Sequence, residues 1–223
     1  MDLRAPIREL LHAALRLYVL TDQELEAGRD VQFVVNEAIE GGATAIQLRW
    51  KSGPLAVALR SGQALRALCR ETGILFFVND RVDLALALGA DGVHLGVDDL
   101  PVSAAREVIG DQMFIGYSPV TTDDAVSAEQ LGADYLGVGP IFGTTTKADA
   151  GNAVGTEHLA AIVRAVSIPV VGIGGITADN SPAVIAAGAA GVAVISAVIG
   201  ARDVQAAARE LRGQVDSAIE ASR

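Results

Sequence analysis

The chain has 223 residues, a formal net charge of −10 at pH 7, and a composition that is 51% hydrophobic but only 4% aromatic. The acidic charge argues against nucleic acid or an anionic membrane surface as a partner. No apolar run reaches the roughly 18 residues that a membrane span needs. The N-terminal residues carry charge and a proline, unlike a signal peptide. With Cys69 as its single cysteine, placed on the core-facing side of a helix, the chain is expected to be cytoplasmic.

A short glycine-containing phrase recurs along the chain and predicts its organisation. Each copy indicates the end of a helix, a glycine that stops it, and then an apolar strand too short to be a helix. The copies occupy 40–47, 88–94, 131–137 and 187–193. Extending from them predicts strands at about 17–21, 44–50, 74–79, 92–95, 113–117, 134–138, 169–173 and 191–195. Helices are predicted at about 5–15, 31–41, 55–72, 81–88, 101–109, 122–131, 156–166, 179–187 and 203–219.

Eight strand-then-helix units in this length predict an α/β fold, a (β/α)₈ barrel with an extra N-terminal helix. We expect one barrel domain over 1–223, with a leading helix in 1–16 and the barrel itself in 17–223. The competitor is a doubly wound open sheet, which carries a glycine-rich phosphate fingerprint after its first strand. Residues 21–25 hold no glycine, so the barrel is favoured.

The segment from Gly137 to Lys147 carries the strongest chemical signal. An apolar strand breaks at Gly139 and leads into a loop with three hydroxyls and a lysine, at Thr144, Thr145, Thr146 and Lys147. Backbone N–H groups, hydroxyls and one fixed cation form a set that suits phosphate oxygens. It is not a P-loop, because the lysine follows the threonines. A solvent-exposed threonine turn would explain this segment equally well if it stood alone.

The last two strands add to the phosphate signal. In this fold the loops after strands seven and eight form a recurrent phosphate site. Gly175 follows the predicted seventh strand, and Ile195 and Ser196 follow the eighth. A glycine allows the backbone to come close to a ligand. Together with the threonine loop, three separate segments therefore favour phosphate binding.

The second strand ends with the polar residues Gln47, Arg49 and Lys51 at alternate positions, which places them on one face of the strand. Such a face is costly in a buried strand unless it borders a polar site. A frayed, exposed strand end would explain Lys51 well, Arg49 less well and Gln47 poorly. We therefore expect this face to belong to the site.

Acidic and polar groups follow the next strands. Asn79 and Asp80 follow the third, Asp99 follows the fourth, and Ser118 lies at the end of the fifth. Asn79, Asp80 and Asp99 could instead cap or open the helices that come next. Two carboxylates at neighbouring strand ends, beside cations that suit phosphate, form an arrangement typical of Mg²⁺.

The three histidines give little direct signal. His12 and His158 are predicted to be surface residues, and His94, on the fourth strand, is predicted to be a buried histidine with satisfied hydrogen bonds. The sequence contains no Ser/His/Asp set, no HExxH and no CxxC. Hydrolase and zinc-site interpretations therefore have no support.

At this point the chain resembles the thiamine-phosphate synthase family, in order from Leu17 to about Ser196. The motifs are specific together and weak one by one. They are Gln47-Leu-Arg-x-Lys51, Asn79-Asp-Arg81, Gly92-Val-His-Leu-Gly-x-x-Asp-Leu-Pro101, Gly139-Pro-Ile-Phe-x-Thr-x-Thr-Lys147 and Gly172-Ile-Gly-Gly-Ile176.

The resemblance implies that a pyrimidine methyl diphosphate is joined to a thiazole phosphate, giving thiamine monophosphate and diphosphate. It implies catalytic roles for Lys147, Arg49 and Ser118, and Mg²⁺ held by Asp80 and Asp99. The implied pyrimidine diphosphate site is Gln47, Arg49, Lys51, Asn79, Ser118 and Lys147. The implied thiazole phosphate site is Thr144, Thr145, Thr146, Gly175, Ile195 and Ser196.

The chain departs from the family pattern at Trp50, Val97 and Gly143, none of which removes a side chain with an implied role. Alternatives remain: a thiazole tautomerase-like isomerase, another phosphate-binding barrel enzyme, or a barrel that only senses a phosphorylated metabolite. The partners expected are small-molecule substrates, with no nucleic acid and no membrane. A homo-oligomer is left open.

Overall fold

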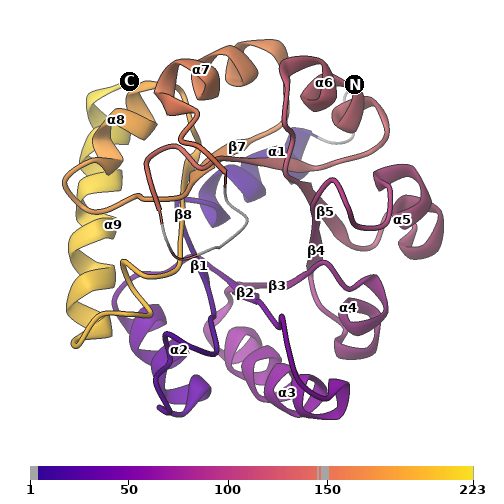
Figure 1. Cartoon of the computed structure of the whole chain (residues 1–223), viewed down its shortest axis with the longest axis vertical. Coiled ribbons are helices and arrows are strands. Elements are labelled where there is room, and N and C mark those ends of the chain that lie inside the picture. The colour runs from indigo at the N-terminus through magenta and orange to yellow at the C-terminus, as the bar shows by residue number, and fades with distance from the viewer. Residues whose placement is uncertain (1–4, 145, 147–150, 223) are drawn as a thin grey trace.

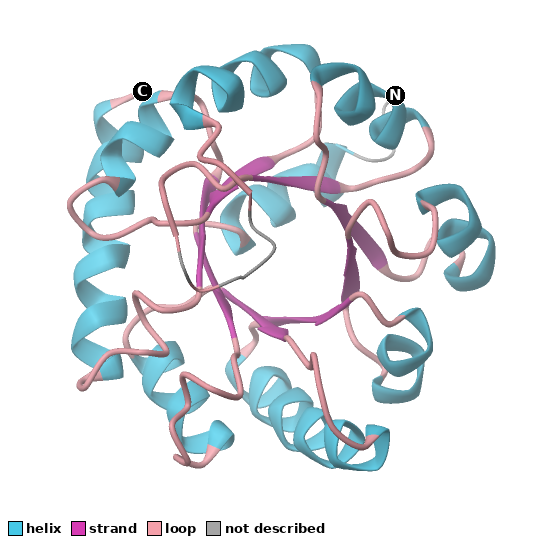
Figure 2. Ribbon diagram, in the orientation of Figure 1, coloured by secondary structure: helices cyan, strands magenta, loops and turns pink. Residues whose placement is uncertain are grey.

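The computed structural model describes residues 5–144, 146 and 151–222. Its eight strands pair in parallel, each with its sequence neighbours, and β1 also pairs with β8, so that the sheet closes into a barrel. The helices surround the strands as an outer ring (Figures 1 and 2). The predicted (β/α)₈ barrel is therefore confirmed.

The elements agree with the predicted ones to within two residues at each end. The strands are β1 (Leu17–Leu20), β2 (Ala45–Leu48), β3 (Leu75–Asn79), β4 (Gly92–Leu95), β5 (Phe114–Tyr117), β6 (Tyr135–Val138), β7 (Val170–Ile173) and β8 (Gly191–Val194). The helices among the described residues are α1 (Ala5–Ala14), α2 (Val31–Glu40), α3 (Leu55–Thr72), α4 (Val82–Leu88), α5 (Val102–Ile109), α6 (Thr122–Gln130), α7 (Gly155–Ala165), α8 (Ser181–Ala186) and α9 (Val204–Ala221).

In two of its copies, at 89–91 and 132–134, the recurring phrase reads Gly-Ala-Asp, and its aspartate ties a helix to the start of a strand. After α4, Gly89 takes the left-handed conformation, with φ of 57°, that ends the helix. Asp91 then accepts hydrogen bonds from both terminal nitrogens of Arg66, at 2.8 and 2.9 Å, and from the backbone N–H of Phe76. Asp134 holds Arg106 and the N–H of Ile115 in the same way. The two aspartates thus link β3 to β4 and β5 to β6 at the amino ends of the strands.

Two hydrophobic clusters fill the molecule. The larger lies between the strands and the helices and contains Cys69, which is fully buried as predicted, with the pKa of its thiol raised to about 12 by burial. The smaller fills the barrel interior and includes Tyr18, Phe77 and Tyr135. Leu11 of α1 and the following Leu15 belong to this interior cluster. The leading helix therefore closes one end of the barrel, behind the strands in Figure 1, and leaves the opposite end for a site.

None of the described helices is both long enough and apolar enough to cross a membrane.

Candidate active site

A cavity of about 550 Å³ opens at the carboxyl ends of the strands. Active sites of such barrels lie at this end, because the strand-to-helix loops can vary there without disturbing the packed strands. The cavity brings together residues predicted separately from seven strand ends. They are Lys51, Asn79, Asp80, Asp99, Ser118, Thr144, Thr146, Gly175, Ile195 and Ser196.

The second strand ends earlier than predicted, and this changes the position of its polar residues. Strand β2 stops at Leu48, so the shared face expected for Gln47, Arg49 and Lys51 does not extend beyond Gln47. Gln47 is 1% exposed and donates from Nε2 to the Tyr18 hydroxyl at 2.6 Å, inside the barrel. Its Oε1 is buried and has no hydrogen-bond partner among the residues that the structure describes. Gln47 therefore keeps one acceptor that the protein does not use.

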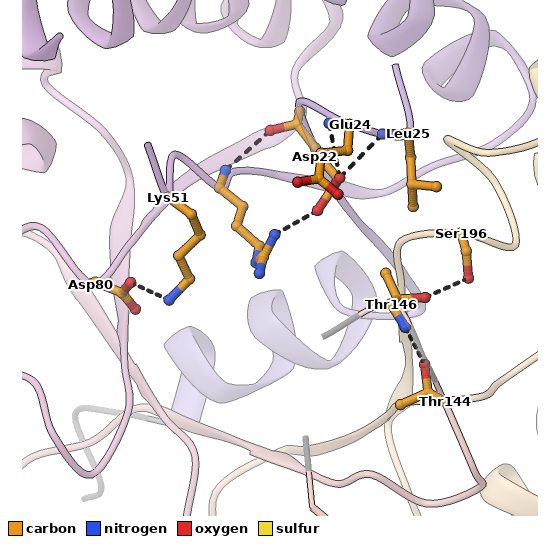
Figure 3. A network of polar contacts seen from close by, with 10 residues as sticks. Asp22, Glu24, Leu25, Lys51, Asp80, Thr144, Thr146 and Ser196 are labelled. Atoms are coloured by element: carbon orange, nitrogen blue, oxygen red, sulfur yellow. Dashed lines mark hydrogen bonds and ion pairs between the residues drawn. The ribbon is translucent and has the colours of Figure 1, made fainter. Parts of the chain in front are cut away.

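Arg49 is buried beside an acid that the sequence analysis did not select. Its guanidinium is paired with Asp22 at 2.5 Å, and both side chains are about one-tenth exposed. Asp22 also accepts the N–H groups of Glu24 and Leu25, at 3.1 and 3.2 Å, which fixes the loop after β1 (Figure 3). Asp22 directly follows the predicted first strand (17–21), just as Asp80 follows the predicted third, so the sequence did carry a signal for it.

Lys51 and Asp80 point toward one another across the loops after β2 and β3, with Nζ 2.8 Å from Oδ2 (Figure 3). Asp80 has φ of 64°, an uncommon conformation for a residue other than glycine. Its backbone N–H donates to the carbonyl of His94 on β4 at 2.8 Å. The β4 backbone and the Lys51 ammonium therefore both hold Asp80 in the cavity wall.

Asp99 lies close to Asp80. Its Oδ2 accepts the N–H of Gly96 at 2.7 Å, which closes the loop after β4. Burial, reinforced by the negative charge of Asp80, raises the pKa of Asp99. Asn79, Asp80 and Asp99 do not cap or open the helices that follow them, so that alternative is wrong. The residue directly before α4 is Arg81, and the residue directly before α5 is Pro101.

The acid pair fits a divalent cation in a limited way. Among the described residues, no group of three or more His, Cys, Asp or Glu side chains could hold a metal ion. The charge of Asp80 is close enough to help raise the pKa of Asp99, and two neighbouring carboxylates favour a cation between them. Mg²⁺ commonly takes only one or two carboxylates from a protein and fills its remaining positions with water and phosphate oxygens. The residues present therefore suit Mg²⁺ bound together with a phosphorylated substrate.

The loop after β6 meets the segments that follow β7 and β8. Thr146 donates from Oγ1 to the Ser196 hydroxyl at 3.1 Å, and its N–H donates to Oγ1 of Thr144 at 3.2 Å (Figure 3). Gly175 has φ of 65°, and a Cβ there would lie 2.6 Å from the carbonyl oxygen of Gly143. Because Gly175 has no side chain, the loop after β6 can pack against it. Gly175 also borders the cavity. Thr145 and Lys147 lie outside the described residues.

This second region is rich in hydrogen-bond donors. Within the part of the chain that the structure describes, the backbone N–H groups of Gly175, Ser196 and Ala197 have no backbone acceptor. A helical turn follows β8, with the N–H of Ile199 donating to Ile195 at 2.8 Å. Unpaired N–H groups at the start of a helical turn favour an anion.

Two histidines border the same cavity. His94 is bonded at both ring nitrogens, to the Tyr135 hydroxyl at 3.0 Å and to the Ser118 hydroxyl at 2.9 Å, as predicted, but it is half-buried where a buried residue was predicted. His158 was predicted to be a surface residue, and this is wrong. It is half-buried on the first turn of α7.

The closed barrel, with a polar cavity at the carboxyl ends of its strands, defines the chain as a (β/α)₈-barrel enzyme. A family model described as thiamine monophosphate synthase matches residues 17–198. The chain belongs to this family.

Individual relatives agree. The chain is 55% identical to the thiamine-phosphate synthase of Moorella thermoacetica over 202 residues, which covers 91% of this chain and 96% of that protein. It is 52% identical to the thiamine-phosphate synthase of Haloarcula marismortui, covering 90% and 96% respectively. A solved structure of the thiamine phosphate pyrophosphorylase from Pyrococcus furiosus is similar with a TM-score of 0.87 and 48% identity, covering 94% of this chain and 99% of that one.

Proposed function

We propose that this transferase joins a pyrimidine methyl diphosphate to a thiazole phosphate, with the residues of this cavity in the roles set out below. One observation carries the assignment of roles. The cavity has two chemically different polar regions, an ionic one at Lys51, Asp80 and Asp99 and a hydroxyl and N–H region at Thr146 and Ser196. Two separate regions suit two phosphorylated substrates held side by side.

The diphosphate substrate is assigned to the ionic region. Lys51, Asn79 and Ser118 border the cavity, and Arg49, which is paired with Asp22, is assigned to this region from the sequence. Gln47 contributes its unused Oε1 from inside the barrel. The sequence adds Lys147, which follows Thr146 directly. These groups place cations around the diphosphate and polar groups around the ring.

Asp80 and Asp99 are assigned to hold Mg²⁺ against the diphosphate. When bound, the ion would neutralise charge that develops on the leaving group. The Lys51 ammonium, 2.8 Å from Asp80, adds a second positive charge at the same place. The acids and Lys51 thus act on the same oxygens, those that gain negative charge as the carbon–oxygen bond breaks.

The reaction needs orientation and charge stabilisation more than a protein nucleophile. The bond between the pyrimidine methylene carbon and the diphosphate oxygen breaks, and the electron pair leaves with the diphosphate. The ring and its amino group delocalise the positive charge, and the thiazole nitrogen then forms the new bond to that carbon. Donors fixed in advance around the departing oxygens favour such a transition state.

The thiazole phosphate is assigned to the second region. The hydroxyls of Thr144, Thr146 and Ser196 and the backbone N–H groups at Gly175 and Ser196 supply donors without a net charge. The bond between Thr146 and Ser196 keeps the loops after β6 and β8 together, so both can contact the same phosphate. Thr145 and Ile195 complete this assignment from the sequence.

The thiazole tautomerase-like alternative is not favoured. An isomerase that moves a proton needs one phosphate site, so the paired acids beside Lys51 would have no role. The relatives named above are synthases, at about 50% identity over most of the chain.

Ser196→Ala should raise the KM for thiazole phosphate about tenfold, the effect of losing one hydrogen bond to a charged group, and should leave the KM for the diphosphate within about twofold of its original value. Steady-state kinetics with each substrate varied in turn measures this. Ser167→Ala is the matched control, because Ser167 hydrogen-bonds Glu129 just before β7, at the opposite end of the barrel. If only the KM for the diphosphate rose, the two regions would be assigned the wrong way round.

A further inference from the structure

A chain of hydrogen-bonded side chains crosses the barrel interior and joins two residues of the proposed diphosphate site. Nε2 of Gln47 lies 2.6 Å from the Tyr18 hydroxyl, which lies 3.0 Å from the Tyr135 hydroxyl. The Tyr135 hydroxyl lies 3.0 Å from Nδ1 of His94, and Nε2 of His94 lies 2.9 Å from the hydroxyl of Ser118. Neither tyrosine was selected from the sequence, where each looks like an ordinary core residue.

Glycines on neighbouring strands make room for these large side chains. Gly116 pairs in register with His94 on one side and with Tyr135 on the other. A Cβ at Gly116 would lie 2.2 Å from the Tyr135 ring and 2.4 Å from Nδ1 of His94. A Cβ at Gly137 would lie 3.0 Å from the His94 ring. Gly116 and Gly137 have no side chains, and the hydrogen-bonded side chains fill the space that this leaves.

The burial of this chain makes its hydrogen bonds costly to break. Tyr18 is 1% exposed and Tyr135 is fully buried. Burial raises the pKa of both phenols, so both remain protonated. Each hydroxyl has one proton to donate, and a buried hydroxyl without a partner is unfavourable. The protons along the chain must therefore all point the same way.

The direction follows from the Gln47 end. When Nε2 of Gln47 donates to Tyr18, the Tyr18 O–H donates to Tyr135, and the Tyr135 O–H donates to Nδ1 of His94. Nδ1 is then an acceptor, so neutral His94 carries its proton on Nε2. Nε2–H donates to the oxygen of Ser118, whose own proton is left for the cavity.

We propose that Tyr18 and Tyr135 are positioning residues that fix the polarity of both ends of the diphosphate site, through the Gln47–Tyr18–Tyr135–His94–Ser118 chain. Gln47 then presents its amide oxygen, an acceptor suited to an N–H of the substrate. Ser118 presents its hydroxyl proton, a donor suited to an anionic oxygen. With the opposite polarity, Ser118 would present lone pairs to a diphosphate, which is unfavourable. The kinetic part of this inference rests on the proposed function, whereas the tautomer of His94 does not.

The tautomer is measured by ¹⁵N NMR of the imidazole nitrogens at about pH 8, above the ordinary histidine pKa of roughly 6.5. The His94 signals are identified by their loss in His94→Gln. We expect a protonated Nε2 and an acceptor-type Nδ1 in the unsubstituted protein. A proton on Nδ1 would overturn the proposal, because it requires the opposite direction along the whole chain.

Two hydroxyl deletions and a matched control extend the test. Tyr135→Phe removes the donor to Nδ1, so the His94 tautomers should become mixed. Tyr18→Phe leaves that donor in place, so the tautomer should persist. The control is Tyr117→Phe, which removes the hydroxyl of the third tyrosine in the protein. That hydroxyl donates to Asp124 and does not belong to the Gln47–Ser118 series of hydrogen bonds.

In the synthase assay, Tyr18→Phe and Tyr135→Phe should each lower kcat/KM for the diphosphate about tenfold, the scale of one lost hydrogen bond. The KM for thiazole phosphate should stay unchanged in both, and Tyr117→Phe should behave as the unsubstituted protein does. Equal activity of Tyr135→Phe and Tyr117→Phe would contradict the positioning role. An unsubstituted protein that shows the expected tautomer but makes no thiamine monophosphate would contradict the proposed function alone.

Discussion

Asp99→Asn is expected to lower kcat about 10²–10³-fold, the range found when one electrostatic stabiliser of a transition state is removed. It should also raise the Mg²⁺ concentration needed for half-maximal activity. The amide has nearly the same shape, and its oxygen can still accept the N–H of Gly96, so the loop after β4 should keep its conformation. The change therefore removes mainly the charge. Activity titrated against Mg²⁺, with EDTA as the zero point, measures both effects.

The matched control is Asp83→Asn. Asp83 lies on α4 and is paired with Arg81, with more than half of its side chain exposed, so it loses the same charge outside the cavity. Its activity should stay within about twofold of the original, since exposed ion pairs contribute little. Full activity of the unsubstituted protein in EDTA would remove Asp80 and Asp99 from the metal assignment.

Lys147→Ala is expected to lower kcat by about 10²–10³-fold, because a cation beside the departing diphosphate acts most where negative charge grows. Lys147→Arg should recover part of the loss, since the charge stays and the compact ammonium does not. The measurement is single-turnover kinetics at saturating substrates, where weakened binding has no effect on the rate. A Lys147→Ala protein that reacts at the original rate would limit Lys147 to substrate capture.

Lys51 is the natural comparison for Lys147. These two are the only lysines of the chain, whose other cationic side chains are arginines and histidines. Lys51 is held by Asp80 at 2.8 Å, so Lys51→Ala should also disturb the proposed metal site, and its activity loss should depend on Mg²⁺. The loss in Lys147→Ala should not. The two lysines can therefore be separated by repeating the assay at low and high Mg²⁺.

The fold was predictable because its signals are local. Most helix-to-strand passages are marked by a glycine such as Gly89, and each strand is a short apolar run, so these two local signals were enough to place the strands and helices. Local patterns do not show the hydrogen-bond partners of the aspartates in the Gly-Ala-Asp phrase. Asp91 looks like a loop residue in the sequence, and only the folded barrel brings Arg66 and the Phe76 backbone to it.

Site residues that come directly after a strand were predictable from the sequence. Contacts that form only when the barrel closes were not. Thr146 and Ser196 lie fifty residues apart and were each selected from the end of a strand, and they share a hydrogen bond. The partner of Arg49 is Asp22, in the loop after the neighbouring strand β1, and the sequence analysis left Asp22 unassigned. The bond between Tyr18 and Tyr135 spans the barrel interior, between strands that are not neighbours in the sheet. No local pattern contains such a contact.

The central claim is that this cavity joins two phosphorylated substrates. The most direct measurement incubates the purified chain with the pyrimidine methyl diphosphate, thiazole phosphate and Mg²⁺, and follows thiamine monophosphate and diphosphate together. We predict equal amounts of both products, dependent on both substrates and abolished by EDTA. Diphosphate release without thiamine monophosphate, or isomerisation of the thiazole phosphate in the absence of the pyrimidine substrate, would contradict the claim.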